Sequence, residues 1–338
     1  MTADSAAAKE SAVSFVIPAR NEAECIGRCI DAIKAMETAG RKVEIIVVDN
    51  GSKDGTADIA MARGAMVVSK GKGTIGSLRN FGSQVSKGDY LAFLDADCIV
   101  PVDWLEKSFL SFDADPRTVV GFRMLIPEDA NWVARCWDTL FAGRNVTSEV
   151  EWLPSGNMIM PSEAFFSVEG FDEELETNED CDICFRLGKK GYTMISSAET
   201  TVLHLRPPQS LSQVFKKELW HGKEVFNVFL DDLRSSREVS IFRTKNLKVV
   251  LYATCYLFLL LILAGALAMS LSRISIIPLA VALALTFLPS LVLAVRYAGV
   301  VGEGGMIPGL TVLLTVYGMS RAISLLPYEK FMGRSVKD

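Results

Sequence analysis

The chain has 338 residues, half of them apolar, with a formal net charge of −5 and a mean hydropathy of +0.28. The length fits about two domains, and the apolar content excludes disorder for most of the chain. The slight acidic excess argues against nucleic acid as a partner, because nucleic-acid-binding domains are usually basic. A positive mean hydropathy is unusual for a soluble enzyme, so the apolar residues are expected to concentrate in one region.

The N-terminal part of the sequence alternates short apolar runs with segments of helical periodicity. Such alternation predicts an α/β fold, with a mostly parallel sheet and helices on both of its faces. Strands are expected at 14–18, 43–48, 65–69 and 90–94, and helices at 24–39, after Asp54 or Thr56, and at 77–85. Ligands of such sheets bind beyond the carboxyl ends of the strands.

Polar residues follow three of these strand ends, namely Arg20-Asn21-Glu22, Asp49-Asn50 and Asp95-Ala96-Asp97. In the D-x-D pattern, both carboxylates can emerge at one sheet edge and offer the hard oxygen ligands that Mg²⁺ or Mn²⁺ prefers. Aspartate is also favoured in ordinary strand-end turns. Because Asp49 stands at a neighbouring strand end, the metal interpretation is the stronger one. No GxGxxG follows the first strand, which argues against a dinucleotide site.

Two acidic residues, Glu179 and Asp180, precede an apolar helical segment. Carboxylates at this position can simply complement the helix dipole. A carboxylate beside a metal-bound phosphate can instead act as a general base. The spacing of the residues does not choose between the two interpretations.

The apolar residues gather at the end of the chain. Uncharged stretches at 249–272 and 274–295 exceed the ~20 residues that cross a hydrocarbon core, and a third span is expected at 305–327 although Arg321 interrupts it. The N-terminus lacks the features of a signal peptide, so the front of the chain is expected to stay in the cytoplasm. Basic residues before the first span suit that orientation. Three spans would place the basic tail outside, so the alternative is a third segment that is re-entrant or interfacial.

The segment 210–230 has its apolar residues near one helical face, with Trp220 and several lysines. It suits the membrane interface and equally suits packing on the catalytic domain. The expected organisation is a flexible N-terminus (1–12), a catalytic domain (13–209), an interface helix and linker (210–245), a membrane region (246–328) and a tail (329–338).

Several motifs in their order resemble family-2 inverting glycosyltransferases of the GT-A fold, over roughly residues 13–230. They are V-I-P-A-R-N-E at 16–22, V-V-D-N-G-S-K-D-G-T at 47–56, K-G and L-R-N-F-G within 72–82, L-D-A-D at 94–97, S-G-N-M at 155–158, G-F-D-E at 170–173 and E-D-x-D-x-x-x-R at 179–186. Each motif is modest alone, but the ordered set is specific.

The resemblance implies a role for each matching residue. Asp180 would be the catalytic base, with Glu179 beside it as the second candidate. Asp97 would ligate Mn²⁺ or Mg²⁺, Asp95 would contact the ribose or the metal, and His204 matches a position where some relatives supply a metal ligand. The donor would contact Pro18, Arg20, Glu22, Asp49, Lys72 and Arg79, and Gly156 and Asn157 would form the floor of the sugar and acceptor pocket.

The expected function is a metal-dependent, inverting transfer of a sugar from a nucleotide-diphosphate donor, by default a UDP-sugar, to a lipid-linked saccharide. The protein is expected to be a multi-pass protein of the inner membrane, with its catalytic domain on the cytoplasmic side. The expected process is surface polysaccharide or glycolipid assembly. Transfer to polyprenyl phosphate is the alternative reaction. A non-catalytic membrane scaffold of the same fold is the alternative without chemistry.

Overall fold

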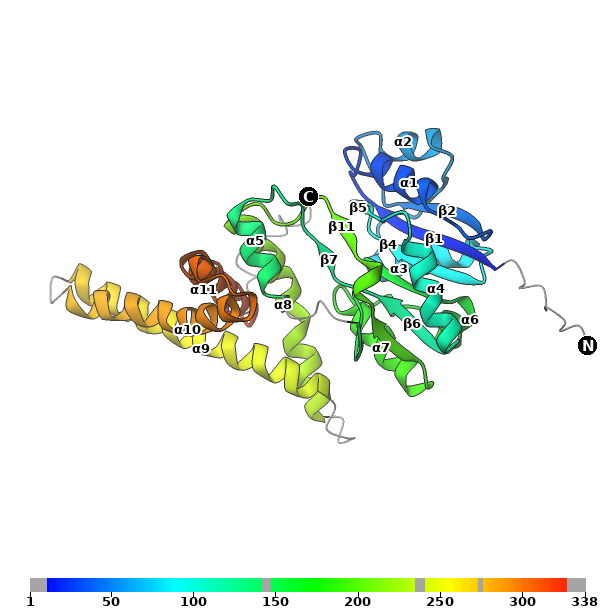
Figure 1. Cartoon of the computed structure of the whole chain (residues 1–338). Coiled ribbons are helices and arrows are strands. Elements are labelled where there is room, and N and C mark those ends of the chain that lie inside the picture. The colour runs from blue at the N-terminus through cyan, green and yellow to red at the C-terminus, as the bar shows by residue number, and fades with distance from the viewer. Residues whose placement is uncertain (1–10, 142–146, 235–240, 273–275, 327–338) are drawn as a thin grey trace, which may run out of the picture. The chain divides into compact units, whose positions relative to one another are not determined.

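The computed structural model describes residues 11–141, 147–234, 241–272 and 276–326, and side chains outside 223–246 (Figure 1). The chain forms two compact units. Unit 1 holds residues 1–128 and 144–206, and unit 2 holds residues 129–143 and 207–338. Residues 129–143 thus belong to unit 2, although they lie inside the segment 13–209 that was expected to form the catalytic domain.

Unit 1 is built on a mixed sheet of eight strands in the order β3-β2-β1-β4-β9-β6-β10-β8. The four predicted strands are present, and they pair in parallel. Beyond β4 the sheet departs from the parallel expectation, because β9 pairs antiparallel with both β4 and β6. In sheet order the strands are β3 (Met66–Ser69), β2 (Lys42–Asp49), β1 (Ala12–Ala19), β4 (Tyr90–Leu94), β9 (Asn157–Pro161), β6 (Thr118–Gly121), β10 (Thr193–Ser196) and β8 (Ser148–Val150).

A small second sheet carries the predicted site residue His204. It consists of β5 (Cys98–Ile99), β11 (Val202–His204) and β7 (Met124–Leu125), with β11 in the middle. The short helix η1 (Ala198–Thr200) precedes β11. The helices of unit 1 are α1 (Ile26–Ala35), α2 (Thr56–Ala62), α3 (Ile75–Val85), α4 (Trp104–Ala114), α6 (Ser162–Ser167) and α7 (Glu179–Lys189).

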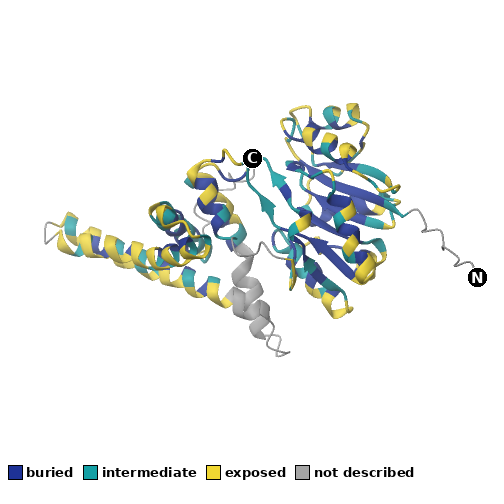
Figure 2. Cartoon of the chain, in the orientation of Figure 1, coloured by how far each residue is buried: buried dark blue, intermediate teal, exposed yellow. Residues whose placement is uncertain are grey.

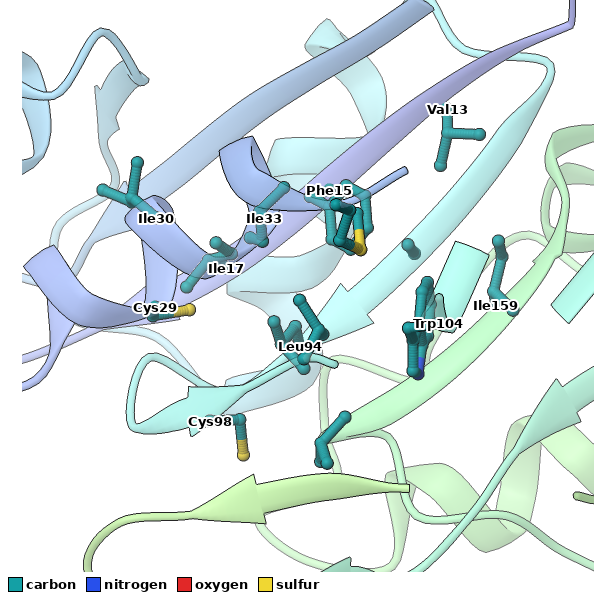
Figure 3. Close-up of a cluster of buried hydrophobic side chains, with 14 of the residues drawn as sticks. Val13, Phe15, Ile17, Cys29, Ile30, Ile33, Leu94, Cys98, Trp104 and Ile159 are labelled. Carbon is teal, nitrogen blue, oxygen red and sulfur yellow. The ribbon is translucent and has the colours of Figure 1, made fainter. Parts of the chain in front are cut away.

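Both faces of the large sheet are covered by apolar side chains. Alternate residues of β1 point to opposite faces, so Phe15 and Ile17 belong to one core cluster and Val16 to the other. Figure 3 shows the first cluster, in which Trp104 and Ile33 come from helices that cover the sheet. The strands are the most buried part of unit 1 (Figure 2). This rigid double-sided core holds the strand ends, and therefore the polar loops that follow them, in place.

Unit 2 is helical, and three of its helices are long and apolar enough to cross a membrane. These candidate spans are Leu247–Leu271, Ile277–Val301 and Gly304–Ser324, so the apolar region expected from the sequence is confirmed as three helices. Many apolar side chains of the first two spans are exposed, as membrane-facing residues are, whereas those of the third span are mostly covered (Figure 2). The elements of unit 2 are α5 (Trp132–Thr139), α8 (Leu211–Arg234), α9 (Ile241–Leu271), α10 (Ile277–Val301), η2 (Gly304–Met306) and α11 (Ile307–Ser324).

Candidate active site

The carboxyl ends of the parallel strands meet at one edge of the large sheet, as the sequence predicted. Ala19 at the end of β1 lies opposite Asp49 at the end of β2. At the end of β4, Leu94 lies opposite Asn157, the first residue of the antiparallel strand β9. The loops after β1, β2 and β4 and the segment before β9 therefore converge, which brings the predicted site residues of four chain segments together.

The loops after β1 and β2 are joined by hydrogen bonds. Asn21, in the left-handed conformation with φ of 55°, accepts from Lys53 N–H at 2.9 Å and donates its own N–H to Ser52 Oγ at 3.0 Å. The buried Asp49 carboxylate accepts from Gly51 N–H at 3.1 Å and Ser52 N–H at 3.2 Å. Carboxylates in such turns fix the backbone locally. These hydrogen bonds hold the two loops together.

The other predicted donor residues differ in exposure. Pro18 is buried within β1, whereas Arg20 is exposed at the end of that strand. Lys72 is also exposed, in the glycine-rich loop between β3 and α3. Of these three side chains, the two cations are accessible to an anionic donor, and their contact with it stays a prediction.

Arg79 is the centre of the site. Its guanidinium, 3% exposed, donates from Nη2 to Asp95 Oδ1 at 2.9 Å and from Nη1 to Glu179 Oε1 at 3.0 Å. Ser155 Oγ also donates to Glu179 Oε1, at 3.0 Å. Charge-assisted hydrogen bonds of this kind are among the strongest in proteins. Loss of either partner would leave a buried charge without its counterion. Arg79 thereby links the interior of α3 to the end of β4 and the start of α7.

A second group of charged side chains is centred on Asp97. His204 Nε2 lies 3.1 Å from Asp97 Oδ2, because antiparallel pairing of β5 and β11 sets His204 opposite Cys98. Arg206 follows two residues later, pairs with Glu22 and places its Nε 3.9 Å from Asp97 Oδ2. The backbone supports this arrangement, since Leu205 N–H donates to Asp97 O at 2.8 Å.

The Asp97–His204 pair fits a divalent cation. A carboxylate oxygen and an imidazole nitrogen are both suitable ligands for Mn²⁺, and such ions are often held by one or two protein groups together with substrate phosphates and water. Within the described residues, no group of three or more His, Cys, Asp or Glu side chains is placed to hold a metal ion. Asp95 offers Oδ1 to Arg79, so a metal contact of Asp95 remains a prediction.

The two catalytic candidates at the start of α7 are placed differently. Glu179 is buried and engaged by Arg79 and Ser155. Asp180 is partly exposed, and its Oδ1 accepts from Cys181 N–H at 2.8 Å. The next acid, Asp182, pairs with Arg186 at 2.5 Å, and Arg186 also donates to Val168 O. Asp180 is thus the more accessible of the Glu179–Asp180 pair.

The residues before β9 approach Asp95 closely. A Cβ on Gly156 would lie 2.3 Å from Asp95 Oδ2, so only glycine leaves room for this carboxylate. Asn157 is fully buried, and its amide donates to Phe122 O and Thr200 O while accepting from Trp104 Nε1. Asn157 therefore supports the sheet edge from inside, and sugar contact by either residue stays a prediction.

Two contributors were not predicted from the sequence, Arg206 and Ser155. The sequence offered one clue to each: Arg206 follows His204 by two residues in an extended run, and Ser155 belongs to the S-G-N-M motif.

Two cysteines also lie beneath the acidic loop. Burial raises the pKa of the Cys29 and Cys98 thiols, and the charges of Asp95 and Asp97 raise it further. Both thiols therefore stay protonated and add no negative charge to the site.

Residues 14–175 match the family described as Glycosyl transferase family 2. The matched domain belongs to this family. Glycosyltransferase AglE of Haloferax volcanii is 28% identical over 243 residues, which cover 67% of this chain and 77% of AglE. Succinoglycan biosynthesis protein ExoA of Rhizobium meliloti is 28% identical over 226 residues, covering 62% of this chain and 67% of ExoA. The family expected from the motifs is confirmed over these residues.

Solved structures agree on the fold. A mannosyltransferase from Pyrobaculum calidifontis, in complex with GDP-Man and Mn²⁺, has a TM-score of 0.58 at 17% identity, over 94% of this chain and 88% of that one. GalNAc-T7 with UDP, GalNAc and Mn²⁺ has a TM-score of 0.51 at 16% identity, over 71% and 55% of the two chains. At this level of identity the likeness shows the fold alone, and the GT-A fold is confirmed.

Gly156→Ala tests the close packing against Asp95. The new methyl group must displace the Asp95 carboxylate or the backbone, and overpacking of this kind costs about 1–3 kcal/mol. We expect a lower free energy of unfolding in denaturant titrations and at least tenfold weaker nucleotide binding. Gly71→Ala is the control, because a Cβ at Gly71 meets nothing within 4 Å. Unchanged nucleotide binding by Gly156→Ala would show that the position of Asp95 does not affect nucleotide affinity.

His204→Ala tests the cation pair. Removing one of the two proposed protein ligands, Asp97 and His204, should weaken Mn²⁺ binding about tenfold or more, as measured by calorimetry with the purified full chain. His221→Ala, which changes the only other histidine of the sequence, should leave Mn²⁺ affinity unchanged. Equal Mn²⁺ affinity in the two variants would remove His204 from the metal site.

Proposed function

We propose that the protein is a metal-dependent inverting glycosyltransferase that transfers a sugar from a nucleotide-diphosphate donor to a lipid-linked saccharide at the cytoplasmic face of the inner membrane. The observation that carries this proposal is the convergence of Arg79, Asp95, Asp97, Asp180 and His204 on one sheet edge, in a chain whose other unit has helices of membrane length. In this account residues 13–209 supply catalysis, and residues 246–328 anchor it beside a membrane-bound acceptor.

The donor would bind over the ordered loops after β1 and β2. The exposed side chains of Arg20 and Lys72 would approach its diphosphate, and Asp49 would lie at the base or ribose. UDP is the default nucleotide. The GDP-Man and UDP complexes named above belong to proteins of the same fold, and they support a nucleotide-sugar donor here.

Asp97 and His204 would hold the divalent cation. When bound, such a cation neutralises charge on the leaving diphosphate. Arg79 fixes Asp95 and Glu179 by two hydrogen bonds, so neither carboxylate is a mobile base. Arg206, paired with Glu22, places positive charge close to Asp97. These residues orient the donor's reacting end at the sheet edge.

Asp180 would take the proton from the acceptor hydroxyl as that oxygen attacks the anomeric carbon. Its partly exposed position at the N-terminus of α7 supports this role over that of the buried Glu179. A single displacement breaks the bond to the diphosphate as the new glycosidic bond forms, which inverts the configuration. A polyprenyl phosphate is already ionised and needs no such base, so an accessible Asp180 favours a hydroxyl acceptor.

The relatives support an acceptor in glycan assembly. ExoA is named as a succinoglycan biosynthesis protein, and AglE as a glycosyltransferase. A pre-mycofactocin glycosyltransferase of Mycobacterium tuberculosis is also 28% identical, but this chain covers only 46% of that protein. A membrane anchor is consistent with a saccharide carried on a lipid, since anchor and acceptor then share one surface.

Asp180→Asn tests the catalytic base. The variant should bind the nucleotide sugar with unchanged Kd but transfer it about 10²–10⁴-fold more slowly, the usual contribution of general base catalysis. Donor binding is measured by calorimetry and transfer by nucleotide release. Asp58→Asn is the control, because Asp58 is an exposed acid in the first turn of α2. A near-normal transfer rate in Asp180→Asn would exclude Asp180 as the base.

A further inference from the structure

The third candidate span, which contains α11, is the least apolar, with a mean hydropathy of 1.3 against 2.4 and 2.3 for the others. We propose that α11 lies along the membrane face on which unit 1 folds and does not cross the bilayer. The chain then crosses the membrane twice, through α9 and α10, and its C-terminal tail returns to the side of unit 1. This inference is independent of the proposed reaction.

The N-terminal part of α11 packs against α5. A Cβ on Gly309 would lie 3.0 Å from Cys136 Sγ and 3.3 Å from the Trp132 ring, and Leu310 shares a core cluster with Val133. Helix α5 has eight residues, and the chain enters it from unit 1 and returns to unit 1. So short an excursion, about 12 Å of helix, cannot cross a 30 Å core and come back. The start of α11 is therefore on the face of unit 1.

The C-terminal part of α11 packs against α8. Ser320 Oγ donates to Phe215 O at 2.9 Å, and Arg321 Nη2 lies 2.5 Å from Glu218 Oε2. One turn further on, a Cβ on Gly222 would lie 2.2 Å from Ser324 Oγ. Between these contacts α8 carries three consecutive charges at 216–218, which makes it too polar for a membrane span. Thus the end of α11 lies on the same face as its start.

A spanning α11 of 18 residues, about 27 Å long, would separate these two ends by nearly the whole hydrocarbon core. The ends instead contact two helices that the chain keeps on one face. Helix α11 meets α9 at Tyr252, whose hydroxyl donates to Leu314 O at 3.2 Å, and at Tyr256, beside Gly318. Both tyrosines lie in the half of α9 that follows α8 in the chain.

The other halves of α9 and α10 line a shared open apolar groove through Ile262, Ala266, Ala282 and Leu285. Figure 1 shows α9 and α10 running together across the view while α11 is seen nearly end-on, so α11 crosses their direction and does not run beside them as a third span. Helices α9 and α10 therefore form the membrane hairpin.

Charge is consistent with two crossings. The side chain of Glu218, 3% exposed, pairs with Arg321, and such charged side chains are rare inside a hydrocarbon core. The tail carries Lys330, Arg334 and Lys337. Three crossings would place these residues opposite the basic residues 243–248, whereas two crossings place both groups on one side, as the positive-inside tendency requires.

Reporter fusions to the full chain in a bacterial host test the topology. Green fluorescent protein, which fluoresces only on the cytoplasmic side, and alkaline phosphatase, which is active only outside, are fused at three places: before Met1, within 273–275 and after Asp338. We expect the two terminal positions to report the same side and 273–275 the opposite side. A C-terminal reporter on the side of 273–275 would overturn the proposal.

Cross-linking tests the position of α11 directly. In native membranes, oxidation of the pair Gly222→Cys and Ser324→Cys should join α8 to α11 within one chain, as mass spectrometry of peptides would detect. The pair Gly222→Cys and Ser272→Cys, at the far end of α9, is the control and should stay unlinked. Absence of the first cross-link together with a C-terminal reporter on the far side would establish a third crossing.

Discussion

The arrangement at the sheet edge depends on one buried cation, Arg79. A guanidinium that is 3% exposed is costly to bury unless its hydrogen bonds are met, and Asp95 and Glu179 meet two of them. These partners stand 16 and 100 residues away in the sequence, so a single side chain holds three separate segments together. The start of α7, and with it Asp180, is positioned by the same ion group that fixes the end of β4.

The strand register then decides which side chains are available for chemistry. Pairing of β9 with β4 brings Gly156 against Asp95, and pairing of β11 with β5 brings His204 against Asp97. Asn157 and Glu179, whose side chains form hydrogen bonds inside the protein, make the sheet edge rigid. The residues around them, Arg20, Lys72 and Asp180, are more exposed to solvent. The same sheet edge therefore combines fixed and accessible groups.

The sequence predicted β1 to β4 and the converging acids because buried parallel strands appear as continuous apolar runs with polar ends. It did not predict the antiparallel strand β9, since the pairing of Asn157–Pro161 with two distant strands leaves no local pattern. Local periodicity likewise gave no sign that Arg206 reaches Glu22, or that α5 belongs with the C-terminal helices. The ordered motifs, which carry long-range information, pointed to Arg79 and Asp180, and the family resemblance pointed to His204, before any contact was known.

The most direct test of the central claim is nucleotide release by the detergent-purified full chain. The assay supplies Mn²⁺ or Mg²⁺, a panel of nucleotide sugars and a membrane lipid extract, with Asp97→Asn run in parallel. The account predicts release from one donor that requires both metal and lipid and is lost in Asp97→Asn. Silence with every donor despite measurable nucleotide binding, or release that survives Asp97→Asn and chelation, would contradict a metal-dependent transferase centred on this sheet edge.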